Sequence, residues 1–533
     1  MSSGQTHETE GSILWKGFAV LVFIIQALAS AALCFKAISL GMIPDKYLYG
    51  LVIALWLLLM VSALLLFVGM NRSASVAVII KRVFAVLLAG FVCFTGVTGY
   101  KAMGSVKTAV KEVAGTNTGS GEAAVATMNL YVIAKDSAKS ASDCKNYVVG
   151  TAVGENARNS KAALNKMSVE IGTAVKSKEY ASEEDLISAL YRGKLQAVII
   201  NSAKAEVLTE TDEFNGFIGK ARLIREYDIT ESDLEFIPGK TEDETTNTKA
   251  TNSIQSDQAV EGGITTTPFI LYISGSDTRS KQFKTSRSDV NILMAVNPKT
   301  KQILLINTPR DYYIPNPKSA DGEKDKLTHL GLYGVGCSMQ GLGGLYGCTV
   351  NYSVQINFTG LETLVDELGG ITVDNPTAFK AYNGTSFKKG KINLNGQQAL
   401  AYARERHAFA TGDNMRGQNQ MRLITAIIKK LTSPNTALIL NYNAILTDLE
   451  GFIVTNMESD EIENLVKMQL NDMASWNIKT YAVTGYGGYD TTYSMPGTNL
   501  YVTYPYMSTV EKGSGLIDKV LTGETLTDED VSD

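Results

Sequence analysis

The sequence predicts an α/β protein anchored in a membrane, with three transmembrane helices, a small α/β domain and a larger α/β domain. The first hundred of the 533 residues are membrane-like in composition. Two later stretches then alternate short apolar strands with amphipathic helices. A polar, Thr-rich segment at 239–263 lies between these stretches and is typical of a linker. Two or three domains are expected at this length. The net charge of −5 gives no nucleic-acid signature, and we expect no nucleic-acid partner.

Three apolar runs, at 13–35, 48–70 and 76–97, are each long enough to cross a bilayer core. We therefore predict a cytoplasmic N-terminus at 1–12 and three spans within 13–99. The alternative for the first run is a signal peptide, because small residues around Ala29 resemble a cleavage site. The run continues past that point, which favours a retained helix.

Basic residues predict the orientation of the spans. The second connection holds Arg72, Lys81 and Arg82, whereas the first holds two lysines and Asp45. The positive-inside rule therefore places the second connection in the cytoplasm. We expect a multi-pass cell-membrane protein whose residues after about 100 are extracellular.

Residues 101–125 are predicted to be a stalk, and 126–238 a small accessory domain. Alternating apolar residues favour strands at 129–134, 169–175, 195–200 and 217–227, and a helix at 182–191 opens on acidic residues. This stretch contains no catalytic constellation, so an accessory or spacing role is expected.

The larger domain is predicted at 264–521, followed by a disordered acidic tail at 522–533. Strands are expected at 269–274, 290–296 and 302–308, and helices at 359–368, 395–403, 416–431 and 460–472. Asp277, Asp289 and Arg310 stand at the ends of the three strands. Loops at strand ends are where chemistry tends to be placed.

The segment from Tyr402 to Gln420 concentrates arginines between two apolar-periodic runs. Arg404 and Arg406 are two positions apart, so an extended backbone would direct both side chains to one side. The forked donors of such arginines suit the oxygens of a diphosphate.

A helix is expected to begin near Arg416, with Asp413 as its N-cap. Arg416 and Gln420 then share a face, and the helix N-terminus adds its own attraction for anions. The alternative is a set of surface arginines paired with Glu405 and Asp413.

Two of the five cysteines, Cys337 and Cys348, are close together in a Gly-rich stretch. Outside the membrane a disulfide between them is permitted, and we expect one. The alternative is two free thiols. A zinc site is disfavoured because only His329 lies nearby in sequence.

Four short motifs in this order resemble the LytR–CpsA–Psr (LCP) family over about residues 265–520. They are Gly275-Ser276-Asp277, Ser286-Arg287-Ser288-Asp289, Pro309-Arg310-Asp311 and Ala403-Arg404-Glu405-Arg406-His407. The three spans and the accessory domain resemble the capsule-associated branch of that family. The resemblance implies an α/β catalytic domain with a mixed sheet flanked by helices.

The resemblance also implies a function. Family members are membrane-anchored phosphotransferases that move a glycopolymer, such as a capsular polysaccharide or a teichoic acid, from polyprenyl diphosphate onto peptidoglycan. They use a divalent metal, commonly Mg²⁺, with Mn²⁺ as the alternative. Two other functions fit the same residues: a pyrophosphatase acting on the lipid diphosphate, and a non-catalytic surface receptor or regulator of envelope biogenesis.

By the same resemblance, Asp277 and Asp289 hold the metal, and Asp289, Arg310 and Asp311 form the catalytic set. The diphosphate is bound by Arg310, Arg404, Arg406 and Arg416, with Asp413 and Gln420 as further polar site residues. Two positions depart from the family pattern: Ile314 stands where some members have an arginine, and Asn419 replaces an arginine common before the glutamine.

The sequence leaves two interpretations open for each of three polar residues. His329 either borders the site or makes a structural hydrogen bond. His407 either pairs with the diphosphate or packs as a neutral histidine. Asp311 either orients Arg310, which we favour, or accepts the proton of the acceptor hydroxyl.

Overall fold

The structure is a computed structural model that describes part of the chain. The described residues are 10–41, 43–68, 76–114, 124–153, 156–208, 216–235, 260, 262–276, 286–409, 412–433, 445 and 448–532. The chain divides into two compact units. The first comprises Met1–Glu112, Pro434–Asp448 and Ser459–Ala474, and the second comprises Val113–Ser433, Leu449–Glu458 and Ser475–Asp533.

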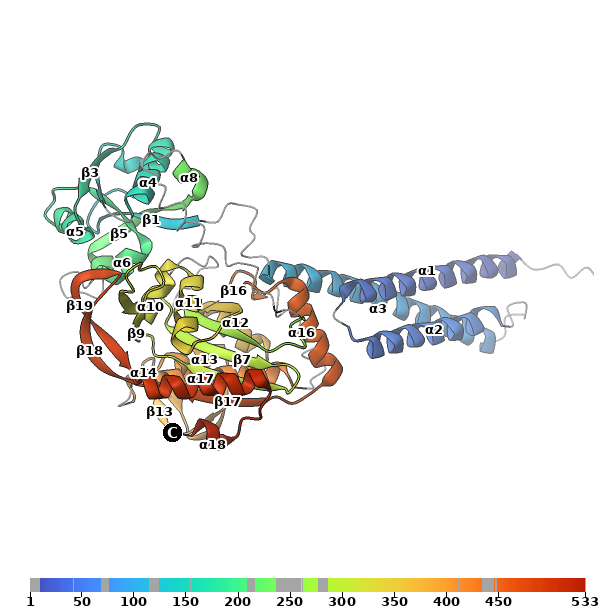
Figure 1. Cartoon of the computed structure of the whole chain (residues 1–533). Coiled ribbons are helices and arrows are strands. Elements are labelled where there is room, and N and C mark those ends of the chain that lie inside the picture. Colours follow the sequence, from blue (N-terminus) through green and yellow to red (C-terminus); the bar gives the residue numbers. More distant parts are fainter. Residues whose placement is uncertain are drawn as a thin grey trace, which may run out of the picture. The chain divides into compact units, whose positions relative to one another are not determined.

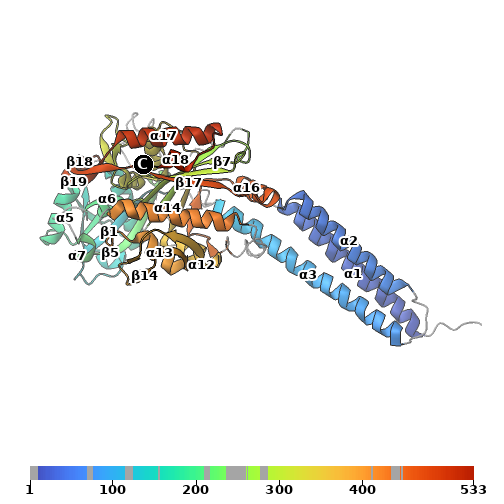
Figure 2. The same ribbon diagram turned by 90° about the horizontal axis from the view of Figure 1, so that it is seen from below.

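The first unit is built from three long apolar helices that lie side by side (Figures 1 and 2). They are α1 (Glu10–Leu40), α2 (Asp45–Phe67) and α3 (Val76–Ala114). Among the described residues, segments 15–40, 45–67 and 76–101 are long and apolar enough to cross a membrane, as predicted. Helix α1 runs unbroken past Ala29.

Helix α3 extends well beyond its membrane-spanning part. It continues to Ala114, so the predicted stalk at 101–125 is helical over its first half, and 115–123 lie outside the described residues. Helix α16 (Ser459–Asp472) belongs to the same unit, where Ile462 packs against Leu40 and Val110.

The accessory region of the second unit is a five-stranded sheet in the order β3-β2-β4-β1-β5. Its strands are β1 (Ala124–Ile133), β2 (Val148–Ala152), β3 (Lys176–Tyr180), β4 (Ala197–Asn201) and β5 (Ala221–Thr230). Its helices are η1 (Ala141–Cys144), α4 (Ala157–Ile171), α5 (Glu183–Tyr191), α6 (Ser202–Leu208), α7 (Phe217–Lys220) and α8 (Glu231–Glu235).

Two predicted strands of this region differ from the structure. Most of 169–175 is the end of α4 and its cap, which closes at Gly172 in a left-handed conformation. The segment 217–227 begins as α7 and becomes strand only at Ala221. The predicted helix at 182–191 is confirmed as α5, where the Ser182 hydroxyl accepts a hydrogen bond from the Asp185 amide. A few alternating apolar residues do not distinguish a strand from the last turn of an amphipathic helix.

The larger region contains a mixed six-stranded sheet in the order β16-β11-β6-β7-β8-β17. Its strands are β6 (Phe269–Ser276), β7 (Val290–Asn297), β8 (Gln302–Asn307), β11 (Tyr352–Asn357), β16 (Ile453–Thr455) and β17 (Asn477–Ala482). Strands β6, β8, β11 and β17 run in one direction, and β7 runs against them. The carboxyl ends of four strands therefore meet at one edge of the sheet, where β7 begins.

Helices cover both faces of this sheet (Figure 2). Helices α11 (Val335–Tyr346) and α17 (Met507–Thr522) pack on one face, over a core that includes Tyr272, Leu293 and Ile306. Helix α14 (Gly412–Leu431) contacts β7, β8 and β17 on the other face, beside α13 (Gly396–Arg404), which in turn packs on α12 (Phe358–Glu367). The predicted mixed α/β fold is confirmed.

Smaller elements complete the region. They are β9 (Tyr313–Pro315), β10 (Lys324–Lys326), α10 (Leu327–Leu330), η3 (Gly331–Tyr333), β12 (Ile371–Asn375), β13 (Phe379–Lys380), β14 (Ser386–Phe387), β15 (Gly390–Leu394), β18 (Gly485–Thr492), β19 (Met495–Pro505) and α18 (Asp528–Val531).

The predicted disorder of the acidic tail is wrong for its described part, which ends at Ser532. Leu526 is buried in the core below the sheet, and Thr527 caps α18. The Asp530 carboxylate lies 2.6 Å from the Lys519 ammonium. Two apolar side chains, Leu526 and Val531, and two ion pairs thus hold a segment whose composition alone favours disorder.

The predicted disulfide is also wrong, because both thiols are free. The Gly-rich stretch forms helix α11 rather than a flexible loop, and Cys337 lies near its start while Cys348 follows its end. With a rise of about 1.5 Å per residue, the helix separates the two cysteines beyond the ~7 Å that a disulfide spans. Burial raises the thiol pKa to about 12 for Cys337 and about 11 for Cys348. Both thiols are therefore protonated at neutral pH.

Candidate active site

The carboxyl edge of the six-stranded sheet gathers most of the predicted site residues. Asp289 immediately precedes β7, Arg310 follows β8, and α12 starts directly after β11 with Asn357 as its N-cap. Open α/β sheets bind ligands at this edge, because loops from several strands converge there. The strand-end positions of Asp289 and Arg310, predicted from the sequence, therefore bring them to one place.

Asp289 and Arg310 form a direct ion pair. The Arg310 Nη1 atom lies 2.9 Å from Asp289 Oδ1, and the side chains are 24% and 30% exposed. The residue before Asp289 fixes the loop: the Ser288 hydroxyl contacts Ser274 Oγ at 2.8 Å and accepts a hydrogen bond from the Tyr272 hydroxyl at 3.0 Å. A buried network of hydroxyl groups therefore holds the Asp289–Arg310 ion pair in a fixed but solvent-accessible position.

Asp311 bridges two cations. Its Oδ2 atom lies 3.6 Å from Arg310 Nε, and its Oδ1 atom lies 3.6 Å from Lys326 Nζ. The Lys326 side chain is only 6% exposed. Asp311 is thus placed to orient Arg310, which agrees with the interpretation favoured from the sequence. Nothing in the sequence around Lys326 indicated its part in this cluster, because the contact joins the segment after β8 to the end of β10.

Arg404, the last residue of α13, is held by two aromatic rings. Its guanidinium carbon lies 4.4 Å from the centre of the Phe358 ring and 5.1 Å from that of Tyr382, and its Nη1 donates to the Tyr382 hydroxyl at 2.7 Å. Phe358 begins α12 at the carboxyl edge. Stacking on Phe358 therefore brings Arg404 to the same edge as Asp289 and fixes the plane of its donors.

Arg406 lies in a different local structure from Arg404. The backbone is not extended throughout: Arg404 is helical, and Glu405 is the extended C-cap. Arg406 is exposed, and its Nε contacts His407 Nε2 at 3.3 Å. His407 is also exposed, which excludes the interpretation in which it packs in the interior. The predicted shared direction of the two arginines does not follow from this backbone.

Glu405 does not neutralise the arginines on either side of it. It is buried, and its two carboxylate oxygens accept hydrogen bonds from the backbone amides of Tyr382, at 2.6 Å, and Ala408, at 2.8 Å. Within the described part of the chain, Arg404 and Arg406 make no ion pair. The alternative in which Glu405 pairs with these arginines is therefore contradicted.

The start of α14 lies against the same edge. A Cβ atom on Gly417 would lie 2.2 Å from Asn307 Nδ2, so only glycine permits this approach to the end of β8. Arg416 is the neighbour of Gly417 in the first turns of α14, and Gln420 donates from Nε2 to the Ala403 carbonyl at 3.3 Å. Gln420 thus supports the helix end that presents Arg404.

The predicted N-cap of α14 is misplaced. The helix begins at Gly412, so Asp413 lies inside its first turn instead of capping it. Of the two departures from the family pattern, Ile314 is buried in the core cluster under the sheet. Asn419 is also buried, and its Oδ1 accepts from Arg422 Nη1 at 2.9 Å.

The structure does not test the predicted metal ligands. Asp277 lies outside the described residues, and within the described ranges there is no group of three or more His, Cys, Asp or Glu side chains that could hold a metal ion. Mg²⁺ does not require such a group, because it binds through one or two carboxylates, waters and substrate phosphates. Asp289, a partly exposed carboxylate at the carboxyl edge, is a donor of that type.

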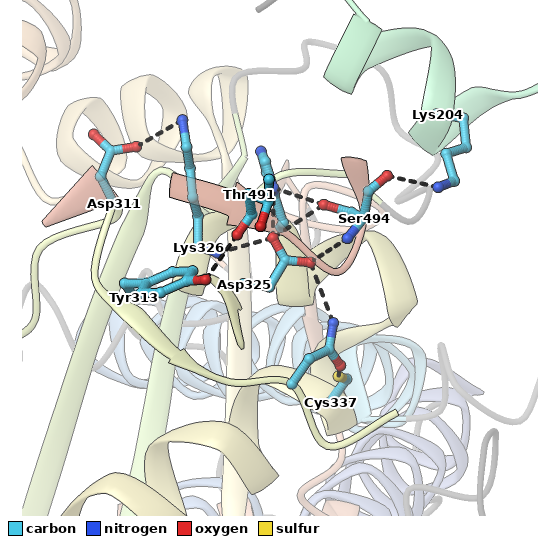
Figure 3. A network of polar contacts seen from close by, with 10 residues as sticks. Lys204, Asp311, Tyr313, Asp325, Lys326, Cys337, Thr491 and Ser494 are labelled. Atoms are coloured by element: carbon cyan, nitrogen blue, oxygen red, sulfur yellow. Dashed lines mark hydrogen bonds and ion pairs between the residues drawn. The ribbon is translucent and has the colours of Figure 1, made fainter. Parts of the chain in front are cut away.

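His329 is a structural residue. It is fully buried, and its Nδ1 lies 2.8 Å from Asp325 Oδ1 and 2.8 Å from the Ser494 hydroxyl. Figure 3 shows Asp325 at the centre of this network, beside the Asp311–Lys326 contact. The Ser494 amide donates to Asp325, and Lys204 of the accessory region donates to the Ser494 carbonyl at 2.6 Å. The network joins the accessory region to strand β10, which carries Asp325 and Lys326.

The region that carries this site is similar to known proteins. The model of the LytR_cpsA_psr family matches residues 237–503, about half of the chain. Two proteins named polyisoprenyl-teichoic acid–peptidoglycan teichoic acid transferase TagU are similar. The one from Enterococcus faecalis is 34% identical over 37% of this chain and 64% of its own length. The one from Bacillus subtilis is 35% identical over 37% and 62%.

The chain thus spans less than two thirds of the length of these relatives. The crystal structure of B. subtilis TagV is 26% identical and covers 49% of this chain and 99% of that chain, with a TM-score of 0.41. The family match covers the Asp289, Arg310 and Arg404 motifs together with the strands and helices that position them. The chain belongs to the LytR_cpsA_psr family.

Proposed function

We propose that this protein is a membrane-anchored phosphotransferase that moves a glycopolymer, of teichoic acid or capsular type, from polyprenyl diphosphate onto peptidoglycan. The observation that carries the proposal is that Arg404 and Arg406 have no carboxylate partner among the described residues, whereas Arg310 and Lys326 are paired with Asp289 and Asp311. Uncompensated guanidinium groups at the carboxyl edge fit an anionic ligand. The names of the relatives supply the class of polymer.

The arginine geometry supports the proposed binding of the diphosphate. Phe358 and Tyr382 fix the plane of the Arg404 guanidinium, so its remaining donors face a ligand at little entropic cost. Arg310, fixed by Asp289 and Asp311, supplies a second set of donors. Arg416 and the first turn of α14 add positive potential at the same edge.

The proposed transfer makes one bond and breaks another. A peptidoglycan hydroxyl attacks the phosphorus that bears the glycan, and a P–O bond forms. The P–O bond to the polyprenyl phosphate breaks, and the polyprenyl monophosphate leaves. In this scheme the hydroxyl proton is lost to a base in the solvent, because the Asp311 carboxylate is already paired with Arg310 and Lys326. In phosphoryl transfer the protein contributes chiefly by positioning the reactants and neutralising charge.

We also propose that Asp277 and Asp289 hold a divalent ion, Mg²⁺ or Mn²⁺. Bound there, the ion would neutralise charge on the diphosphate oxygens. Partial exposure of Asp289 supports its access to solvent cations. Isothermal titration of Mg²⁺ into the protein with bound polyprenyl diphosphate tests this, since Asp289→Ala is expected to abolish the metal-binding heat without loss of fold.

The proposed orientation places the site outside the cell. It rests on the basic second connection, of which Lys81 and Arg82 are described and Arg72 is not. Protease added to intact protoplasts is expected to remove the chain beyond about residue 100. Protection of that part would contradict the orientation.

One incubation separates the candidate functions. The purified full chain in detergent is mixed with lipid-linked glycan and peptidoglycan fragments. A covalent conjugate between the two supports the transferase. Release of free phosphorylated glycan without conjugate would indicate a pyrophosphatase, and binding without any product would indicate a receptor.

A further inference from the structure

A two-stranded ribbon formed by β18 and β19 carries an unusual concentration of exposed tyrosines. The residues alternate between two faces of the ribbon, and one face pairs Tyr489 with Tyr501, Thr491 with Asn499, and Gly487 with Thr503. Tyr489 is 71% exposed and Tyr501 47% exposed. Large aromatic side chains left in solvent together usually mark a binding surface. We call this side of the ribbon the tyrosine face.

The tyrosine face has a defined shape. A Cβ atom on Gly487 would lie 2.5 Å from the Tyr501 hydroxyl oxygen and 2.9 Å from Tyr501 Cε2, so the Tyr501 ring lies across the bare backbone of Gly487. The Tyr489 ring is 5.9 Å from the Tyr501 ring and turned by 81°. The Tyr501 ring therefore lies along the ribbon surface, and the Tyr489 ring stands nearly perpendicular to it, so the two rings form an open corner.

The chemistry of the tyrosine face limits its ligand. Its members are tyrosine, threonine, asparagine, glycine and proline, and residues 485–505 contain no lysine or arginine. The one carboxylate of this segment, Asp490, accepts a hydrogen bond from Tyr504, and both belong to the opposite face. Such an uncharged surface does not attract an anionic polymer. Flat rings beside hydroxyl and amide groups fit a sugar, which has C–H faces and hydroxyl edges.

The tyrosine face is continuous with the candidate active site. The Thr503 amide donates to the Asp311 carbonyl at 2.7 Å, and Tyr312 pairs with Thr503 in a bridge. On the opposite face of the ribbon, Tyr504 contacts Tyr313 with ring centres 5.7 Å apart. A chain of sugars stacked on the Tyr501 ring would therefore approach the loop that carries Arg310 and Asp311.

From this geometry we infer that the tyrosine face binds the acceptor: an uncharged strand of N-acetylated hexoses, the backbone of peptidoglycan. The inference rests on the proposed transferase function and adds the place of the acceptor to it. The donor's diphosphate is bound by arginines, whereas the acceptor is bound by rings and neutral polar groups. The charged surface thus binds the donor and the uncharged surface binds the acceptor, so the two ligands do not compete for one surface.

The test uses the full chain in detergent and an uncharged probe, the hexasaccharide of N-acetylglucosamine. Binding is measured by titration calorimetry for wild type, Tyr501→Ala, Tyr489→Ala and Tyr501→Phe. Each loss of a ring is expected to weaken binding about five- to tenfold, whereas Tyr501→Phe keeps the ring and stays within about twofold. Val169→Ala, an exposed apolar position of the accessory region, is the matched control and is expected to bind as wild type.

Donor binding is measured in parallel with polyprenyl diphosphate, and it is expected to be unchanged in all four variants. Saccharide affinity that is unchanged in both alanine variants, or a wild-type preference for isolated teichoic acid over the hexasaccharide, would overturn the inference. Failure of the wild type to transfer glycan, with ring-dependent saccharide binding intact, would instead contradict the proposed function and leave the tyrosine face as a sugar-binding surface.

Discussion

Two groups of cations at the carboxyl edge differ in how they are held. Arg310 and Lys326 contact Asp289 and Asp311, so this group is fixed and partly neutralised before any ligand arrives. Arg404 is fixed by the aromatic rings of Phe358 and Tyr382, without a carboxylate. The first group is therefore suited to positioning during the reaction, and the second keeps its full charge for the anionic ligand.

The largest effect is expected from the first group. Asp289→Ala should reduce glycan transfer by about a hundredfold or more, because it removes the partner of Arg310 and the proposed metal ligand. The measurement is the rate of conjugate formation, with Asp518→Ala, an exposed carboxylate of α17, as the control. Thermal unfolding should be unchanged, since Asp289 lies at a partly exposed loop. Near-normal transfer by Asp289→Ala would remove it from the catalytic set.

The second group, represented by Arg404, is expected to contribute to binding of the donor. Arg404→Ala should weaken donor affinity by roughly ten- to a hundredfold, the value of one charge-assisted contact of about 1.5–3 kcal/mol. Arg404→Lys should also weaken it, because lysine cannot stack on Phe358 and present a planar fork. Fluorescence titration with a labelled polyprenyl diphosphate measures both variants. Arg225→Ala, an arginine of the accessory region paired with Glu170, is the control.

Substitution of Lys326 is expected to affect both the stability of the protein and its transfer activity, which distinguishes Lys326 from Arg404. Lys326→Met leaves Asp311 without its buried cation and should lower the free energy of unfolding by about 1–3 kcal/mol. Transfer should fall by roughly tenfold, since Asp311 then orients Arg310 less well. Chemical denaturation and a transfer assay on the same preparation would show whether the two losses occur together. A loss of stability with wild-type transfer would separate Lys326 from the site.

Asp311→Asn is expected to give the smallest effect. Asparagine keeps one acceptor oxygen for Arg310, so a residue that only orients should lose less than about tenfold in transfer rate. A general base at this position would instead lose about a hundredfold or more. The rate of conjugate formation, measured at saturating donor, distinguishes the two roles.

Much of the fold could be predicted because its signals are local. The apolar strands β6, β7 and β8 are bounded by polar or Pro-containing segments, and the capping signals of α5 and α13 are short-range. The same patterns located Asp289 and Arg310 at strand ends. Helix α11 was missed because its glycines disfavour helix, and packing against the sheet overrode that preference.

The contacts that complete the site are long-range, and no local pattern encodes them. Lys326 reaches Asp311 across a loop, Phe358 lies under Arg404 from another helix, and Gly417 packs on Asn307. Glu405 illustrates the same limit: its neighbours in sequence are arginines, but its hydrogen-bond partners are the backbone amides of Tyr382 and Ala408. The strand pattern located Asp289 and Arg310 at strand ends, the family resemblance implied the roles of the site residues, and tertiary packing determined their partners.

We propose that the arginines of the carboxyl edge bind the diphosphate of the carrier and not the sugar. The most direct measurement compares the affinity of wild type and Arg404→Ala for polyprenyl diphosphate, polyprenyl monophosphate and the free glycan. We expect wild type to prefer diphosphate over monophosphate and Arg404→Ala to lose most of that preference, with free-glycan affinity unchanged. A variant that loses glycan affinity but keeps the full preference for diphosphate would contradict the claim.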